Sequence, residues 1–554
     1  METTQKLFEK IKGTFNEKNS YTYILIILVV FGTFLRTYQL REWLYFYPDQ
    51  ARDLIIVEDY LSGKSDLPLL GFKAASTNFQ LGAMYSYFQI ISAKIFGVSP
   101  ATVAYPDVLF GVLSIPLLYY FLKKYFSEKV SLFLTGLYTV SFYAIRYARF
   151  AWNSNPIPFF VLLFLLALLA LLVEKEKTSW KWIVALGIAL GVGVQLHTVL
   201  LILLPVTSLG IIIYHFIRGS GKTWKKWLVV FLIAIVLNVG QIVSEMRSEF
   251  RNTRQFIKVL SDRSPNEGGG IVESLALNVI CNSQANLLYL SSFENKDECY
   301  LPTYLKNGTD SYPALAVSEH LLTWASLFFG FVLFGFGYLL LWHYLRKEED
   351  EKRKIFLVLN FWYGLLTFLV ILPIVGHNGQ VRYWLPIIFL PFVFLGLIGK
   401  YLSEKIPRRY YWFGVIPICF LVGLNILTIN SEVQQLLVGN RSNAQYVVLG
   451  ELENIKQYII SDSQPQKEAY IFGGQKYMQN FYRQLSYMVT ENDFNLIRGG
   501  RHLERIPTGE VIYFIDQNPE LTQPAKYVST PAELGFKVLY YKNFGNIAIF
   551  RVAN

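Results

Sequence analysis

Long apolar segments separated by short polar loops fill the first 430 positions of this chain of 554 residues. A helix that crosses a bilayer needs about 20 mostly apolar residues, and these segments approach or reach that length. The run from Trp180 to Ile217 is too long for one span at about 1.5 Å rise per residue, so we divide it near His197. We predict about eleven transmembrane helices, at approximately residues 21–40, 101–121, 130–145, 157–173, 180–196, 198–217, 226–245, 319–344, 355–374, 383–400 and 410–429.

The segment 49–97 interrupts this pattern directly after the first apolar segment. Its first half is polar, and its second half, Phe79 to Phe96, is an aromatic run that also contains Gln80, Gln89 and Lys94. We predict two helices that lie in the plane of the membrane interface. The alternative, in which Phe79–Phe96 crosses the membrane, would reverse the side of every later loop.

Two other regions lack the pattern of spans. Residues 246–317 form a polar stretch with Cys281 and Cys299, which we predict to be an outer loop. A disulfide between the two cysteines and two free thiols are both compatible with the sequence. The segment 431–554 has one amphipathic helical stretch at 443–460 and several short strand-like runs, which predict a soluble α/β domain. The strand-like runs are 469–472, 511–515, 536–541 and 547–552, of which the last two resemble a hairpin.

Composition and charge support a membrane protein. The chain is 53% hydrophobic and 16% charged, whereas average soluble domains are about 25% charged. The net charge of +11 could suggest nucleic-acid binding, but the basic residues cluster in short loops between apolar segments, as cytoplasmic loops of membrane proteins do. We therefore predict no nucleic-acid partner, a cytoplasmic N-terminus and an extracytoplasmic C-terminal domain. The first apolar segment lacks a small-residue cleavage site, so we expect it to be a retained helix.

These patterns predict a polytopic α-helical membrane protein with two parts. Residues 1–430 form the transmembrane domain, and residues 431–554 form the extracytoplasmic α/β domain.

Candidate chemistry gathers at the outer ends of the predicted helices. Ionisable residues at such depths are costly and suggest function. Arginine pairs well with phosphate because its planar guanidinium donates two parallel hydrogen bonds, and a carboxylate beside it can act as a general base. The candidates are Asp49, Arg52, Asp53, Arg149, Trp152, Asn153, His197, His377, Arg382 and Tyr383.

Each candidate also has a structural interpretation. Asp49 and Asp53 lie one turn apart at a predicted helix start after Pro48, where the helix dipole favours acidic side chains. His197 is also explained as a packed or capping histidine, and the outer arginines as ligands of lipid head groups.

The string Tyr47-Pro-Asp-Gln-Ala-Arg-Asp resembles the first outer loop of family 39-type glycosyltransferases with the GT-C fold. That family includes protein O-mannosyltransferases and the bacterial enzyme that adds aminoarabinose to lipid A. Further similar strings follow in the family's order, over roughly residues 20–400. They are Pro68-Leu-Leu-Gly-Phe, Leu81-Gly-Ala-Met-Tyr-Ser-Tyr-Phe, Arg149-Phe-Ala-Trp-Asn-Ser-Asn-Pro, Gln195-Leu-His-Thr and Arg382-Tyr-Trp-Leu-Pro.

The resemblance implies a polyprenyl-phosphate-linked sugar donor, extracytoplasmic transfer with inversion, and Asp49 as the catalytic carboxylate. The chain departs from the family at Gln50, where mannosyltransferases carry Glu, and at Ser154, where relatives often carry Pro. Asp53 is the second candidate catalytic carboxylate. The expected acceptor is a lipid, a glycan or a protein, and membrane lipids surround the helices.

The expected roles of the candidate residues follow from this chemistry. Arg52, Arg149 and Arg382 would hold the donor phosphate, while Trp152, Asn153, His197, His377 and Tyr383 are further candidates for the site. No cofactor is expected, because the leaving phosphate would already be paired with arginines. A divalent metal held by Asp49, Asp53 and a histidine is the alternative.

Other functions are compatible with a polytopic chain. A lipid-linked glycan flippase, a polymerase or a lipid transporter is the main alternative, although the sequence shows neither the inverted repeats nor the interrupted helices typical of transporters. A sensor with an outer binding domain is less favoured, because no cytoplasmic domain follows the predicted bundle.

Overall fold

The fold is described from a computed structural model of the whole chain. The residues that it describes are 17–74, 77–217, 223–261, 271–292, 299, 317–375, 380–407, 412–438, 447–473, 475–499, 510–518, 531 and 535–553.

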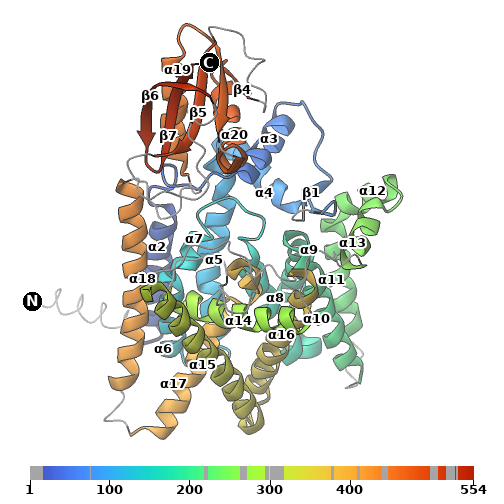
Figure 1. Cartoon of the computed structure of the whole chain (residues 1–554). Coiled ribbons are helices and arrows are strands. Elements are labelled where there is room, and N and C mark those ends of the chain that lie inside the picture. Colours follow the sequence, from blue (N-terminus) through green and yellow to red (C-terminus); the bar gives the residue numbers. More distant parts are fainter. Residues whose placement is uncertain are drawn as a thin grey trace, which may run out of the picture.

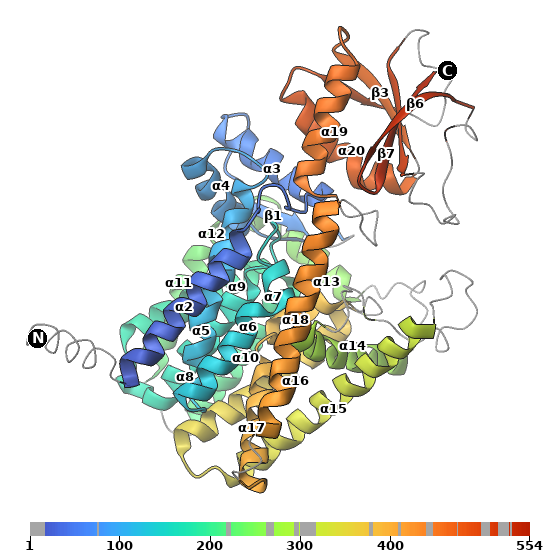
Figure 2. The ribbon, with the colours of Figure 1, turned by 90° about the vertical axis from the view of Figure 1, so that its left-hand side faces the viewer.

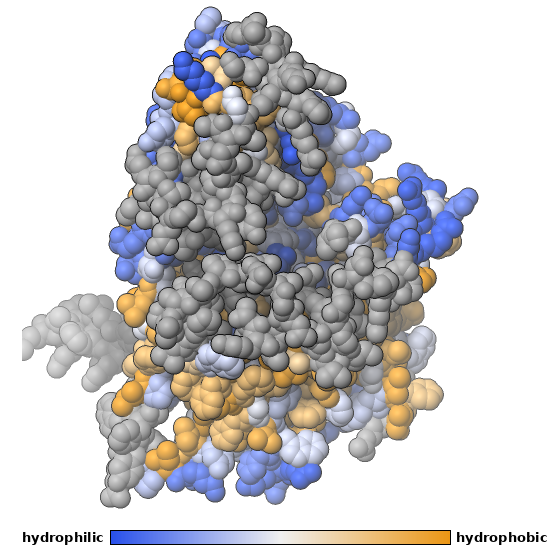
Figure 3. Space-filling view, viewed as in Figure 1, coloured by the Kyte–Doolittle hydropathy of each residue, from blue (hydrophilic) through white to orange (hydrophobic). Residues whose placement is uncertain are grey.

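A bundle of helices forms the larger part of the molecule, and a small sheet domain lies at one end of it (Figures 1 and 2). Apolar side chains form a band on the face shown in Figure 3, with polar side chains below it. The helices of the bundle are α2 (Glu17–Thr37), α5 (Tyr105–Leu122), α6 (Glu128–Val140), α7 (Phe142–Arg146), α8 (Ile157–Glu174), α9 (Trp180–Leu196), α10 (Thr198–Ile217), α11 (Trp224–Leu237), α12 (Val239–Arg247), α14 (Ile271–Ser291), α15 (Val317–Lys347), α16 (Glu351–Val375), η5 (Val381–Ile387), α17 (Leu390–Lys405) and α18 (Trp412–Val438).

The fold class predicted from the sequence is confirmed, but the number of spans is lower than predicted. Among the described residues, seven helices are long and apolar enough to cross a membrane, or up to nine if each of two bent pairs is one span. All eleven predicted segments are helical, yet two of them are too short. The segment at 130–145 is divided at Ser141, whose hydroxyl donates to the carbonyl of Tyr289 at 2.7 Å, and α9 ends after 17 residues. The bent pairs are α11 with α12, at 62°, and η5 with α17, at 63°.

The segment after α2 has the two helices expected in it. They are α3 (Pro48–Leu61) and α4 (Met84–Phe96), and between them β1 (Leu70–Lys73) pairs antiparallel with β2 (Gln80–Gly82). Both helices lie at the same end of the bundle as the sheet domain and beside that domain (Figures 1 and 2).

The region 246–317 differs from the predicted outer loop because it contains α13 (Arg251–Ser261) and the 21-residue α14. Helix α14 packs against α15, α16, α17 and α18. Its polar side chains, such as Asn282 and Asn286, are buried among these helices. Polar residues such as Asn278, Asn282 and Gln284 interrupt its apolar residues, so no apolar run of the length of a span marked this helix in the sequence. Cys281 of α14 is bonded to Cys299, so the disulfide is the alternative that the structure contains.

The C-terminal domain is an α/β unit, as predicted. Its sheet has the order β4-β3-β5-β7-β6, and the first three of these strands run parallel. The predicted strands are present, whereas β4 and α20 were not expected. The elements are α19 (Leu449–Asp462), β3 (Glu468–Gly473), α20 (Gln475–Thr490), β4 (Asn495–Arg498), β5 (Ile512–Gln517), β6 (Lys537–Phe544) and β7 (Ile547–Ala553).

This domain is attached to the segment that precedes α3. The backbone N–H groups of Leu449 and Gly450 donate to the carbonyls of Leu44 and Glu42, at 2.8 and 3.1 Å. Tyr45 forms an isolated antiparallel bridge with Val448. The start of α3 is thus held by the bundle on one side and by the C-terminal domain on the other.

Candidate active site

Helix α3 begins with a local arrangement that its sequence explains. Pro48 is the first helical residue, where a missing N–H leaves no hydrogen bond unmade. The side chain of Gln50 accepts from the backbone N–H of Tyr47 at 2.8 Å and donates to the carbonyl of Ala151 at 2.6 Å. A carboxylate cannot donate to that carbonyl, so the glutamine that departs from the mannosyltransferase pattern connects α3 to the loop before α8.

Arg52 bridges the two acidic side chains of α3. Its Nη1 donates to Asp49 Oδ1 at 3.0 Å, and its Nε and Nη2 both donate to Asp53 Oδ1, at 2.9 and 2.7 Å. The two carboxylates differ in environment, because the Asp49 side chain is 57% exposed and that of Asp53 is 3% exposed. Asp49 is therefore accessible to a substrate, whereas Asp53 holds Arg52 from within the protein.

Burial changes the proton affinity of Asp53. Loss of hydration raises its pKa to about 7, although Arg52 acts in the opposite direction. Asp53 is thus poised to exchange a proton near neutral pH, and the charge that opposes Arg52 depends on pH.

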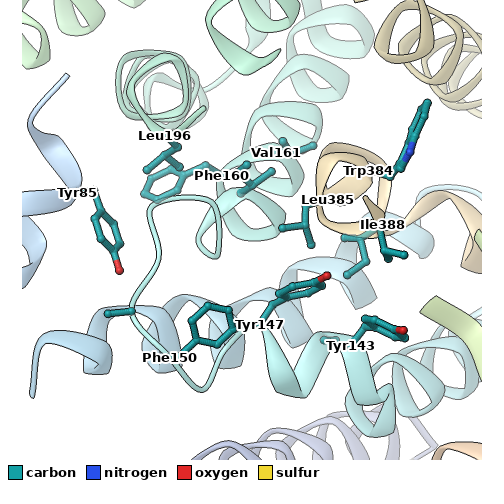
Figure 4. Packing of buried hydrophobic residues seen from close by; sticks show 14 of the residues in the cluster. Tyr85, Tyr143, Tyr147, Phe150, Phe160, Val161, Leu196, Trp384, Leu385 and Ile388 are labelled. Carbon is teal, nitrogen blue, oxygen red and sulfur yellow. The ribbon is translucent and has the colours of Figure 1, made fainter. Parts of the chain in front are cut away.

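A buried polar pair lies next to this group. The guanidinium of Arg52 stacks over Phe72 at 4.7 Å, and Phe72 contacts Tyr85 edge to face. The hydroxyl of Tyr85 donates to Asp107 Oδ2 at 2.7 Å. Figure 4 shows Tyr85 pointing toward the loop that carries Phe150. Phe72, Tyr85 and Asp107 were not among the predicted site residues. Phe72 and Tyr85 lie in two of the strings that resemble the family, but aromatic residues in apolar stretches usually pack in a core.

The loop before α8 connects this pair to the second arginine of the site. The backbone N–H of Trp152 faces the carboxylate of Asp107, and the guanidinium of Arg382 stacks over the Trp152 ring at 4.3 Å. Arg382 also lies 5.4 Å from the ring centroid of its neighbour Tyr383. Within the described part of the chain, Arg382 has no hydrogen bond or ion pair to another side chain. Its guanidinium N–H groups are thus available to an anionic ligand.

His197 and Asn153 complete this group. The rings of His197 and Tyr383 lie 5.9 Å apart, and Asn153 donates to the carbonyl of Leu196 at 2.6 Å. Burial, followed by the positive charge of Arg382, lowers the pKa of His197 to about 4. His197 is therefore neutral near pH 7 and contributes packing or a hydrogen bond.

Arg149 is placed differently from the other predicted arginines. Its Nη1 and Nη2 donate to the carbonyls of Leu35 and Tyr38 at 2.9 and 2.8 Å, where α2 ends. It also lines a separate pocket of about 260 Å³ between α2, α7 and α18. These contacts are those of a helix C-terminal cap.

Two further predictions concern His377 and metal binding. His377 lies outside the described residues. Among the residues that the structure describes, no group of three or more His, Cys, Asp or Glu side chains is arranged to hold a metal ion. Asp49 and Asp53, the two carboxylates of the predicted alternative metal site, both form ion pairs with the guanidinium of Arg52 in this structure.

Part of the sequence matches a known protein family, and the fold is similar to that of solved structures. Residues 82–242 match the family model described as dolichyl-phosphate-mannose-protein mannosyltransferase. The fold is similar to that of ArnT from Cupriavidus metallidurans bound to undecaprenyl phosphate, with 14% identity and a TM-score of 0.52 over 97% of this chain and 98% of that chain. This chain has the GT-C fold.

The apo structure of the same ArnT is similar at 13% identity, with a TM-score of 0.50 and the same coverage. No curated protein sequence matches this chain significantly. The resemblance to family 39-type GT-C proteins is therefore confirmed, and the matched residues 82–242 include the loop with Trp152 and Asn153 as well as His197.

Proposed function

We propose that this protein is an inverting glycosyltransferase that transfers a sugar from a polyprenyl-phosphate-linked donor to an acceptor on the extracytoplasmic face of the membrane. The observation that carries the proposal is the bridge from Arg52 to Asp49 and Asp53, which fixes an exposed carboxylate next to a guanidinium. The GT-C fold and the mannosyltransferase family match support this class of enzyme. ArnT binds undecaprenyl phosphate, and we propose a ligand of the same class for this chain.

In the proposed reaction, Asp49 accepts the proton of an acceptor hydroxyl. The oxygen then attacks the anomeric carbon, and the bond from that carbon to the phosphate oxygen breaks. The electron pair leaves with the polyprenyl phosphate, and one displacement inverts the anomeric configuration. A positioned general base contributes about 10²–10⁴-fold to such a step.

The arginines have the complementary role of stabilising the leaving phosphate. Arg382, which stacks on Trp152 without a carboxylate partner among the described residues, is the principal candidate for this contact. Arg52 contributes positive charge from the Asp49 side, and Asp53 orients it. We assign Arg149 to the end of α2 instead, because its two terminal nitrogens already donate to carbonyls there. The proposed reaction uses no metal ion.

We also propose that the C-terminal domain lies outside the cell membrane and the N-terminus in the cytoplasm. The C-terminal ends of α15 and α17 lie at the end of the bundle opposite the sheet domain (Figure 1). The last residues of α15 and the first residues of α16 include Arg346, Lys347, Lys352, Arg353 and Lys354, in agreement with the charge rule for cytoplasmic loops. The disulfide between Cys281 and Cys299 is compatible with an oxidising compartment.

The direct test is to incubate the purified protein with labelled polyprenyl-phosphate sugars and with a membrane extract of the source cells as acceptor. Release of polyprenyl phosphate together with a labelled product supports a transferase. Movement of the intact donor across the bilayer without its cleavage would instead support a flippase or transporter.

A further inference from the structure

A second cleft lies between α3 and the C-terminal domain. It has a volume of about 670 Å³ and is lined by α3, α20 and β4. Helix α20 stands next to α3 in Figure 1. None of the residues predicted from the sequence for the site comes from α20 or β4. The lining residues that matter for binding are Pro48, Ile55, Tyr482, Arg483, Ser486 and Arg498.

The charge of this cleft comes from two arginines of the C-terminal domain. Arg483 and Arg498 are both exposed, and Arg498 lies 5.7 Å from the ring centroid of Tyr482. In the part of the chain that the structure describes, neither guanidinium has a hydrogen bond or an ion pair. Two arginines with unused donors in one cleft are suited to a phosphate or a carboxylate.

The wall that carries these arginines is fixed to α3 and to the segment before it. The hydroxyl of Tyr487 donates to Glu58 at 2.9 Å, and the side chain of Gln484 donates to the carbonyl of Phe46 at 3.1 Å. Tyr482 donates to the carbonyl of Leu496 at 3.1 Å, which connects α20 to β4. The cleft is therefore formed before any ligand arrives, which reduces the cost of ordering on binding.

The position of the cleft relates it to Asp49. Pro48 and Ile55 of α3 line it, and the exposed Asp49 follows Pro48 directly. The positive charge of Arg483 lowers the pKa of Asp53, so the cleft is close enough to the carboxylates to act on them electrostatically. Arg382 and Trp152 belong instead to the bundle. The carboxylates of α3 are therefore next to the cleft that holds the two arginines of the C-terminal domain.

We propose that the cleft between α3 and α20 binds an anionic sugar of the acceptor, through a phosphate or carboxylate held by Arg483 and Arg498. This inference rests on the proposed transferase function, since it places the acceptor hydroxyl beside Asp49. The lipid-linked donor enters from the bundle side, where its phosphate meets Arg382. The C-terminal domain then selects the acceptor, and the transmembrane domain binds the donor.

The test measures equilibrium binding to the full-length protein in nanodiscs of neutral lipid. The probes are glucose 6-phosphate, glucuronate, uncharged glucose and, separately, undecaprenyl phosphate. The variant is Arg483→Gln with Arg498→Gln, both on the surface, so that folding is preserved. Lys467→Gln, at an exposed position of the same domain that does not line the cleft, is the matched control.

We expect wild-type protein to bind at least one anionic sugar more tightly than glucose. The double variant should bind that sugar at least about tenfold more weakly, because charge-assisted hydrogen bonds are lost. Lys467→Gln should bind it as tightly as wild type does. Undecaprenyl phosphate should bind the double variant as tightly as wild type. A preference for glucose 6-phosphate over glucuronate, or the reverse, identifies the anion.

Three results would overturn the proposal. They are no saturable binding of either anionic sugar, unchanged affinity in the double variant, and loss of undecaprenyl phosphate binding in that variant, which would assign the cleft to the donor. Because none of these readouts needs turnover, failure of the cleft proposal is distinguishable from failure to release polyprenyl phosphate from a donor.

Discussion

At the scale of residues, one arginine decides how the acidic pair of α3 behaves. Arg52 contacts both Asp49 and Asp53, yet only Asp49 is exposed. The sequence placed both carboxylates on one helical face, because residues four apart are neighbours on a helix. It could not show their different burial, which depends on the packing of α4 and α20 against α3.

The raised pKa of Asp53 predicts how stability changes with pH. Its pKa is about 7 in the folded protein and about 3.9 in an unfolded chain. Between these values the folded state binds more protons than the unfolded state, so the contribution of Asp53 to stability falls as pH rises from about 4 to 7. Thermal unfolding of wild type and Asp53→Asn at several pH values checks this. We expect the melting temperature of wild type to fall relative to the variant over that window and to remain level above it; parallel curves would contradict the assignment.

Arg382 and Arg149 give a matched pair of arginines with different predicted roles. Arg382→Ala should weaken binding of undecaprenyl phosphate by about tenfold or more, because a charged hydrogen-bond donor is lost, and Arg382→Lys should restore it only in part. Arg149→Ala should mainly lower the melting temperature, because two carbonyls at the end of α2 lose their donor. Binding and thermal unfolding measured on the same preparations separate the two effects. Equal loss of lipid binding in both alanine variants would return Arg149 to the donor site.

At the scale of elements, buried polar side chains join helices that are far apart in the sequence. Asn425 of α18 accepts from the backbone N–H of Phe142 at 3.0 Å and from the hydroxyl of Ser292 at 2.6 Å. Its amide also donates to the carbonyl of Leu290 at 2.6 Å. One side chain thus connects the start of α7, the end of α14 and the middle of α18.

Replacing Asn425 tests the importance of this junction. Asn425→Leu leaves several buried polar groups without partners, at about 1–3 kcal/mol for each such group, so the melting temperature should fall clearly. Ile426→Leu, at the neighbouring exposed position, is the control and should unfold as wild type does. Thermal unfolding in one detergent compares them, and an unchanged melting temperature of Asn425→Leu would show that the junction adds little.

The predictions from sequence were most accurate for long apolar elements. Helices such as α8, α10 and α16 were located because their apolar runs have the length of a span. Helix α14 was missed for the converse reason, since Asn282, Asn286 and similar polar side chains interrupt its apolar residues and leave no run of the length of a span. In the C-terminal domain β4 was missed because only Leu496 and Ile497 of its four residues are apolar.

At the scale of the whole molecule, the arrangement depends on the C-terminal domain lying on the same side of the membrane as α3. Backbone hydrogen bonds from Leu449 and Gly450 to the segment before α3 join the two parts. These hydrogen bonds could not form if α3 and the C-terminal domain lay on opposite sides of the membrane.

Membrane orientation is therefore a testable consequence of the fold. We expect a reporter that is active only outside the cytoplasm to give a signal when fused after residue 438, and no signal when fused in the turn between α15 and α16. The reason is that the basic loops favour the cytoplasm. A cytoplasmic signal for the fusion after residue 438 would place the entire candidate site on the other face.

The sequence allowed site residues to be predicted in the transmembrane domain but not in the C-terminal domain. The transmembrane half carries strings that resemble a known family, so Asp49, Trp152 and Arg382 could be selected in advance. The cleft beside α20 could not be predicted from the sequence, because Arg483 and Arg498 come close to α3 only when the C-terminal domain packs against it.

The central claim is that Asp49 is the catalytic base, and Asp49→Asn tests it most directly. Transfer rate, undecaprenyl phosphate binding and melting temperature are measured on the same preparation, with Asp66→Asn, an exposed carboxylate of the same outer segment, as the control. We predict that Asp49→Asn folds, binds the lipid as wild type does, and loses about 10²–10⁴-fold in turnover. If Asp49 only stabilises the start of α3, the variant would lose about 0.3–1 kcal/mol of stability and keep its activity. A folded Asp49→Asn protein with turnover close to that of wild type would contradict the account.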